Sequence, residues 1–96
     1  MRLVYSEEAL EDLVRLRNFI AEHNPAASRR IAHDLVGRIE HLREFPELSR
    51  RVAQAPDPEA LRDALFGKYR VRYLVLKSDI AILRIWHHFV LRSGDS

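Results

Sequence analysis

Hydrophobic residues recur at two different spacings along this chain of 96 residues. In the first half they recur every three or four positions, beginning with a stripe of Ala9, Leu13, Leu16 and Ile20. That spacing places their side chains on one face of an α-helix. Ser6 precedes the stripe as a candidate N-cap, and Glu7 and Glu8 suit the positive end of a helix dipole. The pattern predicts an amphipathic helix from Glu7 to about Glu22.

A second stripe at the same spacing follows Asn24-Pro25 and consists of Ala27, Ile31, Leu35, Ile39 and Leu42. Asparagine can cap a helix, and proline is tolerated at the first helical position. Because proline disfavours helical backbone in the residue before it, Pro46 should end this helix near Phe45. We therefore expect a second helix from Asn24-Pro25 to about Phe45, packed on the first as an antiparallel helical hairpin.

The last third of the chain has the composition of β-strands. Tyr69–Leu76 and Asp79–Trp86 are rich in β-branched, aromatic and aliphatic residues, and Lys77 and Ser78 between them favour a turn. These residues predict a β-hairpin. Arg2–Tyr5 alternates briefly and predicts a short strand that joins the same sheet.

Ala60–Phe66 lies between a proline-rich stretch, Pro46–Pro58, and Gly67. Its position favours a strand that pairs with the hairpin, and Pro46–Pro58 is interpreted as a surface connection. The expected order is strand, helix, helix, strand, strand, strand. We predict a single α+β domain over residues 1–96, in which the helical hairpin packs on one face of a mainly antiparallel sheet of three to four strands. The other face stays available to a partner.

Side chains alternate along a strand, so Arg70 and Arg72 point to one face of the hairpin. The loop length decides what the second strand adds to that face. With a loop of two or four residues His87 joins the two arginines, whereas a loop of three residues places Arg84 and Trp86 beside them. The sequence leaves both registers open.

The composition is that of a globular protein, with 47% hydrophobic and 31% charged residues. Sixteen Lys and Arg face fourteen Asp and Glu, so the net charge is only +2. Most of the basic residues are arginines, which bind carboxylates and phosphates through a rigid fork. This charge permits either nucleic acid or an acidic protein as the partner and does not choose between them.

The sequence contains no cysteine, which excludes disulfides and thiolate metal sites. No histidine or acidic residues have the spacing of a metal motif, and no cofactor is expected. No apolar run approaches the roughly 20 residues that span a bilayer, and nothing resembles a signal peptide. A cytoplasmic protein without membrane contact is the expectation.

The end of the chain concentrates the residues that could bind a macromolecular target: Tyr69, Arg70, Arg72, Arg84, Trp86, His87 and His88. Arginines near aromatic residues suit a phosphate or a carboxylate. Each arginine could instead be a solvated strand charge, and each histidine a packing or capping residue. The acidic cluster at the start of the first helix, which ends with Asp12, is explained by the helix dipole and solubility.

These segments resemble the ParE/RelE superfamily of small bacterial toxins from type II toxin-antitoxin modules. The most specific pieces are Tyr-Arg-Val-x-Tyr at Tyr69–Tyr73 and Ile-Leu-Arg-Ile-Trp-His at Ile82–His87. The resemblance implies a toxin that forms a hetero-oligomer with a cognate, ParD-like antitoxin, whose contact residues the sequence does not reveal. RelE-like members cut mRNA in the ribosome, whereas ParE-like members poison DNA gyrase.

No tyrosine follows Tyr73, and Phe89–Ser96 lacks the terminal set that RelE-like nucleases use. The resemblance therefore favours the ParE-like branch, a gyrase inhibitor that is not an enzyme. The alternative is a ribosome-dependent endonuclease in which the three strand arginines stabilise phosphate charge and His87 or His88 transfers a proton. A third alternative is a ParE-like binding partner that is not toxic.

Overall fold

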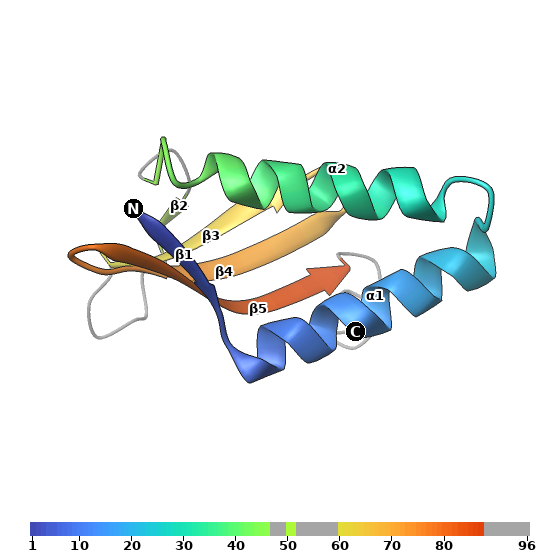
Figure 1. Ribbon diagram of the computed structural model, residues 1–96, viewed down its shortest axis with the longest axis horizontal. Coiled ribbons are helices and arrows are strands. Elements are labelled where there is room, and N and C mark those ends of the chain that lie inside the picture. The colour runs from blue at the N-terminus through green and yellow to red at the C-terminus, as the bar shows by residue number, and fades with distance from the viewer. Residues whose placement is uncertain (47–49, 52–59, 88–96) are drawn as a thin grey trace.

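The computed structural model describes residues 1–46, 50–51 and 60–87 of the chain, which form a sheet with two helices (Figure 1). The elements are β1 (Arg2–Tyr5), α1 (Glu7–His23), α2 (Ser28–His41), β2 (Arg50–Arg51), β3 (Leu61–Phe66), β4 (Tyr69–Val75) and β5 (Asp79–His87). The strand order is β1-β5-β4-β3-β2, and only β1 and β5 pair in parallel. The predicted α+β fold is confirmed, with β2 added at the β3 edge.

The helix boundaries differ from the prediction around Asn24. Ser6 caps α1 as expected, since its Oγ accepts a hydrogen bond of 3.0 Å from Ala9 N. Asn24 closes α1 by donating its N–H to Ile20 O at 2.7 Å, and α2 begins only at Ser28. A residue before proline avoids helical backbone, so Asn24 adopts φ −151° and ψ 69° and does not start the second helix.

The second helix also ends earlier than predicted. The α-helical pattern stops at His41, and the chain continues through Leu42, Arg43 and Glu44 with hydrogen bonds to the third preceding carbonyl. Such tighter turns commonly finish a helix. Of the predicted Pro46–Pro58 connection, Pro46 and the β2 residues belong to the described part, and the remainder lies outside it.

The strands predicted from the sequence are confirmed by their pairing. β3 pairs with β4 along its whole length, from Leu61 opposite Leu74 to Phe66 opposite Tyr69. Gly67 in the turn between them has φ +62°, a left-handed conformation that glycine adopts without steric cost.

The core lies between the helices and one face of the sheet. The helices bury Ala9 and Leu16 of α1 and Leu35 and Ile39 of α2 against strand residues that include Val71, Tyr73, Ile80, Ile82 and Ile85. Tyr73 is fully buried, and its hydroxyl donates to Pro46 O at 2.6 Å. The buried hydroxyl thereby avoids the cost of an unmade hydrogen bond.

A β-bulge in β5 decides which side chains reach the other face. The hairpin loop is short, because Leu76 N donates to Asp79 O at 2.8 Å across Lys77 and Ser78. Tyr73 pairs with Ile82, but Arg72 pairs with Arg84, so the intervening residue of β5 has no opposite partner. One extra residue reverses the alternation of every side chain that follows.

The prediction for a loop of two residues, which placed His87 beside Arg70 and Arg72, is therefore wrong. Trp86 lies opposite Arg70 and Arg84 opposite Arg72, whereas His87 lies opposite Tyr69 on the helix-covered face. The pairing that the sequence associated with a loop of three residues is produced by the bulge.

Candidate target-binding face

The face of the sheet turned away from the helices carries most of the predicted site. We call it the open face; the strand register assigns to it Leu61, Asp63, Leu65, Arg70, Arg72, Leu74, Arg84 and Trp86. Leu65 is 56% exposed. The open face thus combines arginine, tryptophan and leucine side chains.

Two of its arginines are bound to carboxylates of the chain itself. Arg72 donates through Nε and Nη2 to the two oxygens of Asp63 at 2.8 and 3.0 Å. Arg84 donates through Nε and Nη2 to the two oxygens of Asp12 at 2.8 and 3.1 Å. These hydrogen bonds raise the pKa of both guanidinium groups, so both cations stay charged. We call this row, Asp63, Arg72, Arg84 and Asp12, the charge ladder.

Trp86 lies against both cations of the charge ladder. The guanidinium carbons of Arg72 and Arg84 lie 5.3 and 5.4 Å from the centre of its ring. Cations within about 6 Å of an indole ring are attracted by its π electrons. The two arginines therefore fix the orientation of Trp86 on the open face.

Arg70 differs from the other two arginines. It lies between Leu65 and Trp86 on the neighbouring strands, and its Nε is buried without a hydrogen-bond partner. Within residues 1–46, 50–51 and 60–87 no carboxylate forms an ion pair with it. Arg70 is thus the cation of the open face that can bind an anion on a partner.

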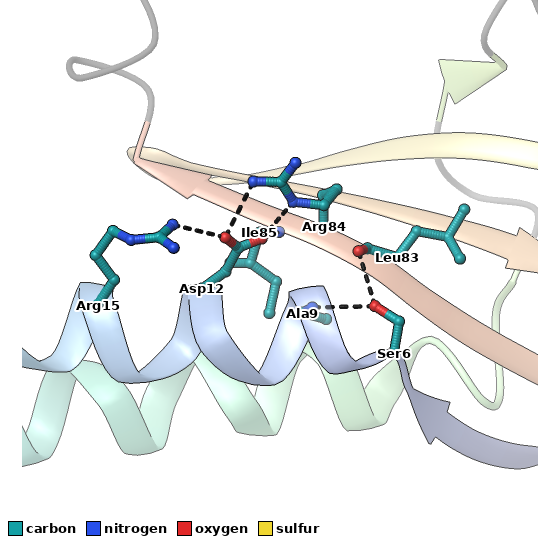
Figure 2. A network of polar contacts seen from close by, with 7 residues as sticks. All are labelled: Ser6, Ala9, Asp12, Arg15, Leu83, Arg84 and Ile85. Atoms are coloured by element: carbon teal, nitrogen blue, oxygen red, sulfur yellow. Dashed lines mark hydrogen bonds and ion pairs between the residues drawn. The ribbon is translucent and has the colours of Figure 1, made fainter.

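Asp12 joins helix α1 to the edge of β5, as Figure 2 shows. Its side chain is 1% exposed, and Oδ2 accepts a hydrogen bond of 2.9 Å from Ile85 N. Arg15 donates to Oδ1 at 2.9 Å from the solvent side. Burial alone would raise the pKa of Asp12, but the hydrogen bonds from Arg84 and Ile85 outweigh burial and hold that pKa below its ordinary value.

Tyr69 and His87, which were predicted to bind the target, lie on the covered face instead. His87 is 9% exposed, and its ring contacts Phe19 of α1 and Tyr69, with ring centres 5.2 and 5.3 Å away. Burial raises the pKa of Tyr69. The structure brings Arg70, Arg72, Arg84 and Trp86 together but separates these two residues from them, and His88 lies outside the described residues.

A groove of about 930 Å³ lies between α2 and the free edge of β3. Its lining residues are His33, Asp34, Gly37, Arg38, His41, Leu42, Phe45, Asp63, Ala64, Leu65 and Phe66. β2 pairs only with Arg62 and Asp63 of β3. In the part of the chain that the structure describes, residues 64–66 have no strand partner on this edge.

Neither a metal site nor a membrane span is found where the structure can be described. Across residues 1–46, 50–51 and 60–87, no three His, Cys, Asp or Glu side chains gather closely enough to hold a metal ion. Neither α1 nor α2 is long and apolar enough to cross a membrane.

Comparison with known proteins identifies the family. Residues 3–89 match the family model described as the ParE toxin of the type II toxin-antitoxin system parDE. The chain belongs to the ParE toxin family. It is thus a type II toxin of the ParE/RelE superfamily, as the resemblance of its motifs implied.

Two curated relatives of this ParE-family chain come from Caulobacter vibrioides. Toxin RelE2 is 33% identical over 86 residues, which cover 90% of this chain and 93% of that protein. Toxin RelE1 is 30% identical over 87 residues, which cover 88% of this chain and 90% of that protein.

Solved structures share the fold of this ParE-family chain at low sequence identity. The chromosomal ParDE toxin-antitoxin system from P. aeruginosa matches with a TM-score of 0.76 and 20% identity, over 91% of this chain and 95% of that one. The RelB-RelE antitoxin-toxin complex from Methanococcus jannaschii matches with a TM-score of 0.54 and 12% identity, over 97% and 99%. At these sequence identities the structural similarity shows only that the fold is shared.

Sequence reasoning missed Asp12, which it assigned to an exposed acidic cluster. The structure shows a buried carboxylate that binds Arg84. A signal was present, since Asp12 lies three positions after Ala9 and four before Leu16 and so belongs to the apolar stripe. An acid within such a stripe predicts a buried partner.

Proposed function

We propose that this ParE-family toxin inhibits DNA gyrase by binding it through the open face and that a cognate, ParD-like antitoxin neutralises it. The observation that carries the proposal is the charge ladder. Arg72 and Arg84 are each bound by a carboxylate of the chain, so the partner meets Trp86, Leu65 and the unpaired Arg70.

Such a surface suits a protein target better than a polyanion. Binding to a nucleic-acid backbone relies on several unpaired Lys and Arg side chains, whereas Asp63 and Asp12 offset two of the three cations here. Protein interfaces concentrate their binding energy in Trp, Tyr and Arg side chains surrounded by apolar contacts. Trp86 and Arg70, with Leu65 beside them, match that description.

The geometry gives little support for proton transfer on the open face. Cleavage of RNA by acid-base catalysis needs a titratable group within reach of the reacting atoms. His87 is buried on the opposite side of the sheet, and both carboxylates of the charge ladder are held by arginines. Among the described residues, the open face has no histidine.

The antitoxin is proposed to occupy the groove between α2 and β3. Among the described strands, none pairs with residues 64–66 on this edge, and an extended peptide can add itself to such an edge. Phe45 and Leu65 are exposed beside this edge and provide apolar contacts. The solved structures named above are toxin-antitoxin systems, which supports a hetero-oligomer with an antitoxin.

One observation favours a second candidate, a ribosome-dependent mRNA endonuclease. The curated relatives are named RelE2 and RelE1, the name of the nuclease branch. In this case the target is the ribosome with its mRNA, Arg70 contacts phosphate, and His88 is the remaining candidate for proton transfer. Primer extension on translated mRNA tests it, since new cleavage sites that vanish in His88→Ala would establish it.

Supercoiling assays test the gyrase proposal directly. The purified chain should inhibit supercoiling or trap cleaved DNA at micromolar concentration, whereas Trp86→Ala and Arg70→Ala should be weakened by about tenfold or more. Glu22→Gln, which changes an exposed acid on α1, is the control and should inhibit like the native chain.

No effect of the native chain on gyrase at micromolar concentration would overturn the proposal. If the chain also leaves growth unchanged when it is expressed alone, the remaining interpretation is a ParE-like binding partner without toxicity. New mRNA cleavage would instead select the nuclease.

A further inference from the structure

We propose that Asp12 is a positioning residue for the open face: its carboxylate holds the bulged edge of β5 and the Arg84 guanidinium, and thereby presents Arg84 and Trp86 to the target. The inference rests on the proposed function, because it assigns a new residue to the same surface. Asp12 itself is buried and does not touch the partner.

The first step concerns the edge of β5. β1 pairs with β5 only as far as Ile82. Beyond that point the N-cap residue Ser6 and helix α1 supply the partners: Ser6 N donates to Ile82 O at 2.9 Å, Ser6 Oγ donates to Leu83 O at 2.9 Å, and Asp12 Oδ2 accepts from Ile85 N at 2.9 Å. These contacts lie on both sides of the bulge, and Figure 2 shows those of Leu83 and Ile85.

A bulge disrupts the ladder of its strand and leaves backbone groups to be paired elsewhere. Leu83 O accepts from Ser6, the N-cap of α1, and Ile85 N donates to Asp12 of α1. An unpaired backbone N–H at a buried position is unfavourable, so loss of the Asp12 acceptor weakens the bulged register.

The second step concerns the side chains after the bulge. Unbroken alternation from Ile82 would turn Arg84 and Trp86 toward the hydrophobic core. The bulge turns them to the open face instead, where Arg84 meets Arg72 directly across the strands. Like charges directly opposite each other repel, and Asp12 offsets this by accepting hydrogen bonds from Nε and Nη2 of Arg84.

The third step links Arg84 to Trp86. With Asp12 in place the guanidinium lies 5.4 Å from the centre of the Trp86 ring. Without it, Arg84 gains no counter-ion from Asp63, which already binds Arg72. Arg84 would then turn toward water, and Trp86 would lose one of its two cationic neighbours.

The test compares Asp12→Asn, Arg84→Met and the double variant with Glu22→Gln as the control. Trp86 is the sole tryptophan, so its fluorescence reports the open face directly. We expect each single variant to shift the Trp86 emission and to weaken gyrase inhibition by about tenfold. The double variant should inhibit gyrase at most about twofold more weakly than either single variant, because Asp12 and Arg84 act through one contact.

Native emission and native inhibition in Asp12→Asn, or additive losses in the double variant, would overturn the inference. If Asp12→Asn does not fold, Arg84→Met carries the test, since it keeps the Asp12 bond to Ile85 N; a native Trp86 spectrum and native inhibition in that variant also overturn it.

The proposed function and the positioning role of Asp12 are contradicted by different results. It fails if the native chain does not inhibit gyrase or if Trp86→Ala and Arg70→Ala inhibit like the native chain. The positioning of Trp86 by Asp12 is then decided by fluorescence alone: a shifted emission in Asp12→Asn supports it, and a native emission overturns it.

Discussion

Arg72 and Arg84 occupy opposite positions on β4 and β5, so two positive side chains face each other across the sheet. Like charges at such positions destabilise a sheet. The carboxylates of Asp63 and Asp12 lie at the two ends of the row and bind one guanidinium each in bidentate geometry. The row is therefore neutral as a unit, which leaves Arg70 as the cation available to a partner.

Removal of one carboxylate from the charge ladder should show how far it offsets the repulsion between Arg72 and Arg84. Asp63→Asn leaves Arg72 opposite Arg84 with a weaker acceptor, and we expect the free energy of unfolding to fall by about 1–2 kcal/mol, allowing for partial solvent exposure of the pair. Urea denaturation measures it. Asp34→Asn, which breaks the exposed pair with Arg38 on α2, is the matched control and should cost less than about 0.5 kcal/mol.

Acid should remove the contribution of Asp12 to the stability of the folded state. The folded state lowers the pKa of this carboxyl, so its stabilising effect is present above the ordinary value of 3.8 and is lost as the pH falls through the lowered pKa. Arg84 on β5 and Arg15 on α1 are the charged groups that bind it, and Glu8 and Glu11 on α1 act on Arg84. Thermal unfolding across acidic pH should therefore depend less steeply on pH in Asp12→Asn, whereas Glu22→Gln should follow the native curve.

A side chain at Gly67, in the turn between β3 and β4, should lower the free energy of unfolding. Its φ of +62° is strained for any residue with a Cβ, although no heavy atom lies within 4 Å of that position. Gly67→Ala should reduce the free energy of unfolding by about 1–2 kcal/mol through backbone strain alone. Gly37→Ala on α2, where a Cβ also meets nothing, should stabilise the helix, and the opposite signs in thermal unfolding test the argument.

The hydroxyl of Tyr73 should matter for stability although its ring supplies most of the buried surface. Tyr73→Phe removes the hydrogen bond to Pro46 O and leaves that carbonyl without this donor. We expect a loss of about 1 kcal/mol in the free energy of unfolding, measured in urea. An unchanged midpoint and slope would mean that water replaces the hydroxyl at no cost.

An exposed residue of the groove beside β3 can be replaced to test antitoxin binding without damage to the core. Phe45 is 46% exposed and lines the groove, so Phe45→Ser should weaken antitoxin binding by about tenfold while the thermal midpoint changes little. Binding of a cognate antitoxin, followed by calorimetry, measures it. Val36→Ser removes a similarly exposed side chain of α2 outside the groove and is the control; equal losses in both variants would contradict the assignment.

The elements and the fold could be predicted from residue spacing, because helical and strand periodicities are local properties of the chain. The stripes on α1 and α2 and the β4–β5 hairpin were predicted from residue spacing and confirmed by the structure. The common face of Arg70 and Arg72 followed from alternation along one strand. The family motifs lie in the same segments, so the sequence alone carries the family resemblance.

The remaining residues of that face depend on contacts between segments that are distant in the sequence. The bulge at Leu83 moves Arg84 and Trp86 to the open face and His87 into the core. The Asp12–Arg84 contact joins positions 72 apart in the sequence, and no local spacing predicts it. Both results have one cause, which is that α1 packs along the edge of β5. The hydrogen bonds and packing between α1 and β5 exist only when these two distant segments come together in the fold.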